Sequence, residues 1–141
     1  MARRTLTLTA ICAVLLCTGV AHAQTGEQLS SSWAQTNVCS STQLGARAQL
    51  AGDGTTSVLS VRFTAQWLSP SGWVPLQGAA TSPWQSAGSA EYTWGQAGWT
   101  FSISVPPGHQ YQLRSVAELR WSGETNHSES HTTASCTVGA N

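Results

Sequence analysis

The densest group of residues that could do chemistry lies near the C-terminal end of the chain. Glu124, His127, Glu129 and His131 fall within one short stretch. The two histidines are four positions apart, a separation at which zinc sites on helices place two imidazoles on one face. The surrounding residues instead predict a turn that enters a strand, where that separation also returns to one face. Because structural zinc sites usually use more ligands, commonly cysteines, we expect neither a metal nor another cofactor.

Glu118, Glu124 and Glu129 are the residues that an enzyme would use. Glycosidases place two carboxyl groups about 5 Å or about 7–9 Å apart across a cleft. A solvated strand face and turn account for these glutamates without catalysis. The chain has no Gly-x-Ser-x-Gly motif, and its single aspartate, Asp53, lies between two glycines. We expect no enzymatic activity, and a small glycan-active enzyme that uses these glutamates is the alternative.

Tryptophan is abundant, with seven residues in the chain. Trp67, Trp99 and Trp121 are in phase with aliphatic residues of predicted strands, so we expect them in the core, where large rings bury much apolar area. The remaining tryptophans lack that register. An in-phase ring has a packing role in the core, whereas an out-of-phase ring is free to serve another purpose.

Four aromatic residues are therefore candidates for a binding surface: Trp73, Trp84, Tyr92 and Trp94. Trp73 follows a predicted turn, and Trp84 lies in a stretch rich in Gly, Ser and Pro. Exposed rings of this kind stack on sugar faces or anchor protein partners. The alternative is that these rings cap the ends of a small core, since tryptophan is highly buried on average.

Residues 1–23 predict a secretory signal peptide. Arg3 and Arg4 form its charged start, an apolar run follows, and Ala21-His22-Ala23 fits the small-x-small cleavage pattern. The apolar run is shorter than the roughly 20 residues of a spanning helix, so we expect no membrane span after cleavage. The mature protein is then secreted.

Two other modes of export are alternatives. A lipid anchor at Cys17 is disfavoured by the bulky Leu16 before it, and twin-arginine export lacks its fuller motif. After cleavage, residues 24–32 form a polar, Ser-rich arm and residues 33–141 form a single domain. This mature chain has four arginines, no lysine and six acidic residues. Without a basic cluster, nucleic acid is excluded as its main partner.

Cys39 and Cys136 are the cysteines that remain after signal cleavage. In an oxidising compartment two cysteines favour one intramolecular disulfide. This bridge would join the first part of the domain to its last strand, and it therefore predicts that the two ends of the domain are adjacent. Free thiols or an intermolecular bridge are the alternatives.

Alternation of apolar and polar residues with a period of two runs through the chain and predicts antiparallel strands. No stretch has the apolar spacing of a long helix. We therefore predict an all-β, antiparallel sandwich of about seven strands, with residues 77–90 as a loop that crosses between the sheets. The predicted strands cover residues 33–42, 46–50, 59–67, 73–76, 91–94, 99–105, 111–121 and 132–138.

Residues 111–117, Tyr-Gln-Leu-Arg-Ser-Val-Ala, resemble the penultimate strand of immunoglobulin-like and fibronectin type III domains. In that strand a tyrosine anchors a corner through its hydroxyl, a role the resemblance implies for Tyr111. Trp67 is similar to the buried tryptophan of a central strand in immunoglobulin domains. The cysteine positions depart from the usual pairing, which joins two inner strands. The chain also resembles small secreted proteins of actinobacteria, a similarity that implies no activity.

One polar face is predicted on two strands that are neighbours in an immunoglobulin-like layout. It would carry three of the four arginines of the mature chain, and pairing with Glu118 would satisfy them without a ligand. Taken together, the sequence favours a secreted, non-catalytic binding or envelope-associated module whose ligand is a cell-wall or extracellular glycan or a protein. The outward residues are Arg62, Thr64, Gln66, Gln112, Arg114, Glu118 and Arg120.

Overall fold

The computed structural model describes residues 31–139, which form strands and turns without a helix. Two antiparallel sheets enclose one hydrophobic core, so the predicted all-β sandwich is confirmed, with nine strands rather than about seven. No segment in this part of the chain could span a membrane as a helix. The strands are β1 (Trp33–Cys39), β2 (Gln43–Ala51), β3 (Val58–Ser69), β4 (Gly72–Pro75), β5 (Gln85–Ser89), β6 (Trp94–Ser102), β7 (Gln110–Ser122), β8 (His127–Thr132) and β9 (Cys136–Gly139).

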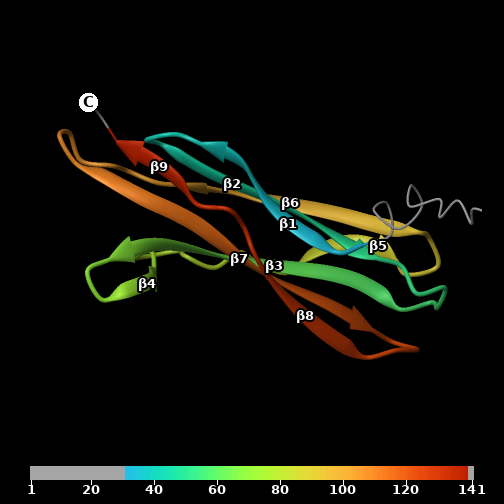
Figure 1. Ribbon diagram of the computed structural model, residues 1–141. Helices are drawn as coiled ribbons and strands as arrows, with labels where there is room; N and C mark the ends of the chain where they lie inside the picture. The colour runs from blue at the N-terminus through green and yellow to red at the C-terminus, as the bar shows by residue number, and fades with distance from the viewer. Residues whose placement is uncertain (1–30, 140–141) are drawn as a thin grey trace, which may run out of the picture.

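The smaller sheet has the order β1-β2-β6, and the larger has the order β4-β3-β7-β8 with β5 beside β3 and β9 beside β7. Figure 1 shows these layers, with β9 beside one half of β7 and β8 beside the other. The longest pairing joins β3 and β7, from Val58 opposite Ser122 to Trp67 opposite Leu113. The outward side chains of these two strands are therefore neighbours, as predicted for the polar face.

Alternation decides which side chains enter the core. Leu59, Val61 and Phe63 of β3 are fully buried, while the residues between them face away from the smaller sheet. β2 contributes the buried side chains of Leu44 and Leu50 to the same core. This strand is longer than the one predicted at residues 46–50. Burial of each such side chain contributes about 1.5–3 kcal/mol to folding.

One of the three tryptophans expected in the core is fully enclosed. Trp121 is 2% exposed, and its Nε1–H donates a hydrogen bond of 2.9 Å to the carbonyl oxygen of Ala51 in the opposite sheet. Trp67 and Trp99 are half-buried and pack against the core, so their predicted place in it is confirmed only in part. Trp67 lies near the end of β3, and Trp99 lies on β6, which is at the edge of the smaller sheet.

The chain passes between the sheets at a different place from the predicted one. Residues 77–90 contain β5, which pairs with β3 in the larger sheet, so they are not a crossing loop. Residues 90–93 form the turn that leads from β5 to β6 in the smaller sheet, which overturns the strand predicted at 91–94. β5 has no large apolar side chain, so the sequence shows no alternation of apolar and polar residues that would predict a strand there.

The strand predicted at 132–138 is also different. β8 and β9 both pair with β7, and the residues between them interrupt the ladder. Thr133 bridges this gap, since its N–H donates to the Ser115 carbonyl oxygen and its Oγ1 accepts from the Ser115 N–H. Because the interruption changes the phase, Thr132 and Ala134 are exposed, whereas Val138 is buried.

The predicted disulfide is confirmed. Cys39 of β1 and Cys136 of β9 form a bond with a Cα–Cα separation of 6.5 Å, and it links the two sheets. Ser31 and Ser32, the last residues of the predicted arm, accept hydrogen bonds from Gln49 and Ala51 of β2. The predicted signal peptide, residues 1–23, lies outside the described residues, as does the rest of the arm.

Candidate functional site

The outer face of the larger sheet carries the predicted polar residues of β3 and β7. Arg62 and Glu118 are paired across these strands, with 2.7 Å between Nη2 and Oε2. Further along, the Nε–H of Arg114 donates to Oε1 of Gln66 at 2.8 Å. The expected pairing of this face with Glu118 therefore involves Arg62 alone among its three arginines.

Trp84 lies over this face. The guanidinium carbon of Arg120 is 3.8 Å from the centroid of its ring, and that of Arg62 is 4.8 Å away. The segment before Trp84 is fastened to β3, because the Phe63 N–H donates to Oγ of the buried Ser82 and the Ser82 N–H donates to the Phe63 carbonyl oxygen. These bonds hold an irregular segment in place and position the ring above the two arginines.

Trp73 occupies a similar place at the other end of the face. It lies on β4 opposite Leu68, and the guanidinium carbon of Arg114 is 4.2 Å from its ring centroid. The hairpin that carries Trp73 turns at Gly72. The backbone φ of 117° at this position is strongly disfavoured for any residue that has a side chain. Arg114 thus reaches from β7 across Gln66 of β3 to the ring on β4.

We call this group the Trp–Arg face: Trp73, Arg114, Arg62, Trp84 and Arg120. Arg114 and Arg120 are six positions apart on β7, which corresponds to about 20 Å along the strand. A guanidinium over an aromatic ring is attracted by the negative face of the ring and contributes about 0.5–1 kcal/mol at an exposed site. The arrangement is therefore an extended strip with a ring–cation contact near each end.

Tyr92 and Trp94, the other two aromatic candidates, lie elsewhere. Tyr92 is in the turn between β5 and β6 and is 71% exposed, and Trp94 begins β6 and is 45% exposed. Trp94 is opposite Ala51 in the smaller sheet. The four candidate residues therefore do not form one patch, since Trp73 and Trp84 belong to the Trp–Arg face and the other two to the β5–β6 turn and the smaller sheet.

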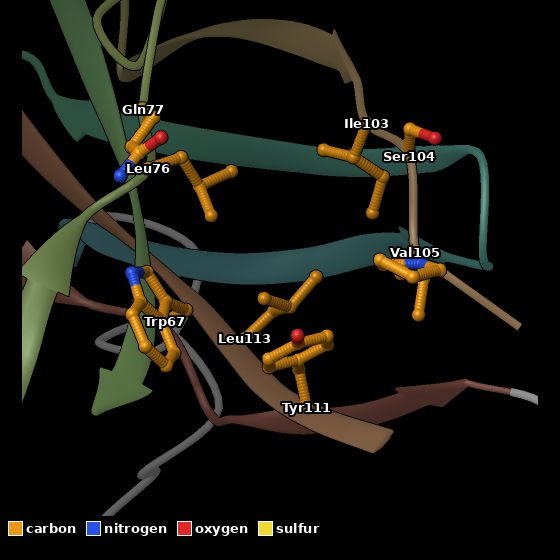
Figure 2. A pocket seen from close by; sticks show the side chains of 9 residues that line it. Trp67, Leu76, Gln77, Ile103, Ser104, Val105, Tyr111 and Leu113 are labelled. Carbon is orange, nitrogen blue, oxygen red and sulfur yellow. The ribbon is translucent and has the colours of Figure 1, made fainter. Parts of the chain in front are cut away.

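A cavity of about 320 Å³ opens on the inner side of the larger sheet. In Figure 2 Trp67, Leu113 and Tyr111 lie on one side of this space, with Leu76 and Ile103 across from them. The rings of Trp67 and Tyr111 meet edge to face, with centroids 5.7 Å apart. This cavity was not predicted, because Trp67 was expected in a closed core and the strand predicted over residues 99–105 was expected to continue past Ser102, where β6 ends.

Tyr111 does not anchor a corner as the family resemblance implies. Among the described residues, its hydroxyl has no hydrogen-bond partner, and its ring contacts Trp67 on one side and stacks with His109 on another. The ring is half-buried and lines the cavity. In this chain the tyrosine therefore shapes the end of the sandwich.

The glutamates considered for catalysis are engaged separately. Glu118 pairs with Arg62, Glu124 accepts hydrogen bonds from the Thr56 N–H and hydroxyl, and Glu129 lies 2.9 Å from Nε2 of His131. His127 stacks on Trp121 at a centroid distance of 4.2 Å. Within residues 31–139 no three His, Cys, Asp or Glu side chains gather as a metal site would require.

Asp53 organises the turn after β2. Hydrogen bonds from the hydroxyls of Thr55 and then Thr125 hold the pKa of its carboxyl below the ordinary value, with a smaller contribution from the Thr55 N–H and from the charge of His127. The carboxylate thereby ties the β2–β3 turn to the β7–β8 turn. Its exposed position and hydroxyl partners give it a structural role.

No protein-family model matches the chain, and no curated protein matches it at a significant level.

Proposed function

We propose that this protein is an exported, non-catalytic binding module that holds an extracellular glycan on its Trp–Arg face. The observation that supports this proposal is the position of Trp73 and Trp84, two half-buried rings that each contact arginine on the outer face of the larger sheet. Indole rings pack against the apolar faces of sugars, and guanidinium groups donate hydrogen bonds to hydroxyl or carboxylate oxygens. The strip provides both kinds of contact along one line.

The length of the strip favours an extended ligand. The contacts at Arg114 and Arg120 are about 20 Å apart along β7, which is long enough for several sugar rings. Arg62 and Arg120 project from the sheet beneath Trp84, so we infer that the opposite side of this ring is the one that meets the ligand. Trp73 would then contact the same chain further along.

The charge of the strip favours an acidic glycan. The Trp–Arg face has three arginines, and one acid, Glu118, lies beside them, whereas the mature chain as a whole has more acids than bases. An anionic ligand would be attracted to this face and repelled by much of the remaining surface. Carboxylates such as those of uronic acids match the planar fork of arginine.

The finer details of the fold are consistent with this role. The first two strands share a sheet with β6, and β3 shares the other with β7 and β8, a partition that resembles immunoglobulin-like and fibronectin type III domains. The disulfide between Cys39 and Cys136 fits secretion, and the likeness to small actinobacterial proteins fits a bacterial source. A role as an envelope-associated module is compatible with glycan binding.

The test is a pull-down of the mature protein on insoluble polysaccharides and isolated cell walls. We expect retention, and we expect Trp84→Ala to reduce the bound fraction at least threefold. Trp94→Ala is the matched control, because this ring is exposed on the other sheet and should leave retention unchanged. Absence of retention on every glycan would remove the proposal and favour a protein ligand. Release of sugar by the protein, lost in Glu124→Gln or Glu129→Gln, would instead support the enzyme alternative.

A further inference from the structure

The cavity beneath Trp67 has an uncharged lining. Apolar side chains dominate it, and no residue that lines it carries a charge. A charged group placed there would lose its hydration without an opposite charge to compensate, which is strongly unfavourable. Any molecule that enters must therefore be neutral in its buried part. The lining residues are Trp67, Leu76, Gln77, Ile103, Ser104, Val105, Pro106, Tyr111 and Leu113.

The volume of the cavity limits the size of the occupant. At about 320 Å³ it is roughly twice the ~150 Å³ of an apolar protein cavity that holds one benzene ring. It also falls near the lower end of ordinary small-molecule sites. Two fused rings would occupy this space, and a larger molecule would have to extend out of it into solvent.

The hydroxyl of Tyr111 is one of the polar groups at this cavity, together with the side chains of Gln77 and Ser104. Figure 2 shows the hydroxyl of Tyr111 directed away from its strand and into the gap between the labelled side chains. This hydroxyl has no hydrogen-bond partner among residues 31–139. Tyr111 is half-buried and its hydroxyl is not among the buried polar atoms that lack a partner, so solvent reaches it and a ligand in the cavity could exchange for that solvent.

The walls of the cavity are held in place by covalent and hydrogen-bonded structure. β9 pairs with the start of β7, which places Val138 opposite Tyr111 and Cys136 opposite Leu113. The disulfide then ties Cys136 to β1 of the other sheet. On the far side, the N–H groups of Ile103 and Val105 donate to carbonyl oxygens of the β1–β2 turn. The cavity is thus preformed, which reduces the entropy cost of binding.

We propose that this cavity is a binding site for one neutral, flat, bicyclic aromatic molecule that bears a hydrogen-bonding group. The rings would occupy the space between Trp67 and Ile103, and the polar group would bond to the Tyr111 hydroxyl. This site is independent of the proposed glycan site, because Trp67 faces the inner side of β3 while Arg62 and Gln66 face the outer side.

The chain offers a clean probe of this cavity. Ile103 is the sole isoleucine in residues 24–141, so selective labelling of isoleucine δ1-methyl groups gives one NMR signal from the cavity wall. We expect 2-naphthol to shift this signal and the Trp67 indole N–H signal saturably, with a dissociation constant of about 1 mM or lower. Naphthalene-2-sulfonate, which has the same rings and a charge, should leave both signals in place.

Two variants locate the site. Tyr111→Phe should weaken 2-naphthol binding about two- to tenfold and leave naphthalene binding unchanged, because only the hydroxyl is removed. Val105→Trp should fill the cavity and weaken binding at least tenfold, and Val58→Trp, at an exposed position outside the cavity, is its control. Dispersed spectra and cooperative melting would establish that each variant is folded.

Three results would overturn the proposal. The first is the absence of an Ile103 shift in the wild-type protein up to the solubility limit of 2-naphthol. The second is an equal response to the sulfonate or at the Trp94 indole, which would indicate surface adsorption. The third is an Ile103 signal that moves with protein concentration alone, which would indicate that a second copy of the chain covers the cavity. None of these results bears on glycan retention.

Discussion

The guanidinium group of Arg120 lies against the ring of Trp84, with 3.8 Å between the guanidinium carbon and the ring centroid. Arg120 belongs to a regular strand, whereas Trp84 belongs to an irregular segment between β4 and β5. Through this contact the ring of Trp84, which does not belong to a strand, lies on the outer surface of the larger sheet. The Trp–Arg face and its expected properties follow from such contacts.

Retention of the protein on an acidic glycan should decrease as salt increases. Raising the concentration from about 50 mM to about 500 mM shortens the screening length well below the separation of the arginines and weakens attraction between exposed charges. The double variant Arg114→Gln/Arg120→Gln should bind less at low salt and respond less to added salt. The measurement is the bound fraction in the pull-down, with a neutral glucan as the control ligand.

If the bound fraction is the same at both salt concentrations, the charges of the strip do not contribute to recognition. The rings alone would then carry the interaction, and a neutral glycan would become the expected ligand.

Trp121→Phe should lower the free energy of unfolding by about 1–3 kcal/mol. The change removes the indole N–H that donates to the Ala51 carbonyl oxygen, and it leaves that acceptor and some core volume unfilled. Urea denaturation measures the difference. Trp94→Phe, at an exposed position, should stay within about 0.5 kcal/mol of the wild type. Equal effects of the two changes would mean that the bond between the sheets adds nothing measurable.

Loss of the disulfide should destabilise the fold by up to about 4–5 kcal/mol, because the bond closes a sequence separation of 97 residues and restricts the unfolded chain. Cys39→Ala/Cys136→Ala tests this by thermal and urea unfolding. A reducing agent should destabilise the wild type to a similar extent and have no effect on the double variant. A loss below about 1 kcal/mol in the double variant would show that this cross-link barely restricts the unfolded state.

Asp53 should make folding stability depend on acid pH. Its hydrogen bonds to Thr55 and Thr125 hold the pKa in the folded state below the ordinary value of 3.8, so the carboxylate stabilises the fold above that pH. This contribution is lost as the pH falls below 3.8 and through the lower pKa of the folded state. Asp53→Asn should therefore be less stable than the wild type at pH 7, and the difference should narrow on acidification. Urea midpoints for both proteins across this range provide the measurement, and parallel curves would exclude the effect.

Much of the fold follows from local pattern, and the exceptions have identifiable causes. β3 and β7 were predicted within one or two residues because large apolar side chains alternate along them. β5 was missed because its residues are small or polar, and its burial in the sheet comes from pairing with β3. The break between β8 and β9 was missed because it depends on the contact between Thr133 and Ser115, which are 18 residues apart.

The arrangement of the four candidate aromatic residues could not be predicted from the sequence. Trp73, Trp84, Tyr92 and Trp94 were identified from their lack of strand register, yet the structure divides them between two places. Their partners could not be identified, since a ring and an arginine that meet across strands have no fixed spacing in the sequence. The cavity was missed for a similar reason, because Leu76, Ile103 and Tyr111 come from three separate segments.

The sequence by itself determined the all-β class and the outward face of β3 and β7, because both depend on a short-range period of residue types. It favoured the pairing of Cys39 with Cys136, and the structure confirms that pairing. Only the tertiary structure decided where the chain crosses between the sheets, which tryptophans are enclosed and which arginines lie against Trp73 and Trp84. These outcomes depend on how far each sheet extends over the other, and that extent is set by the packing of the whole chain.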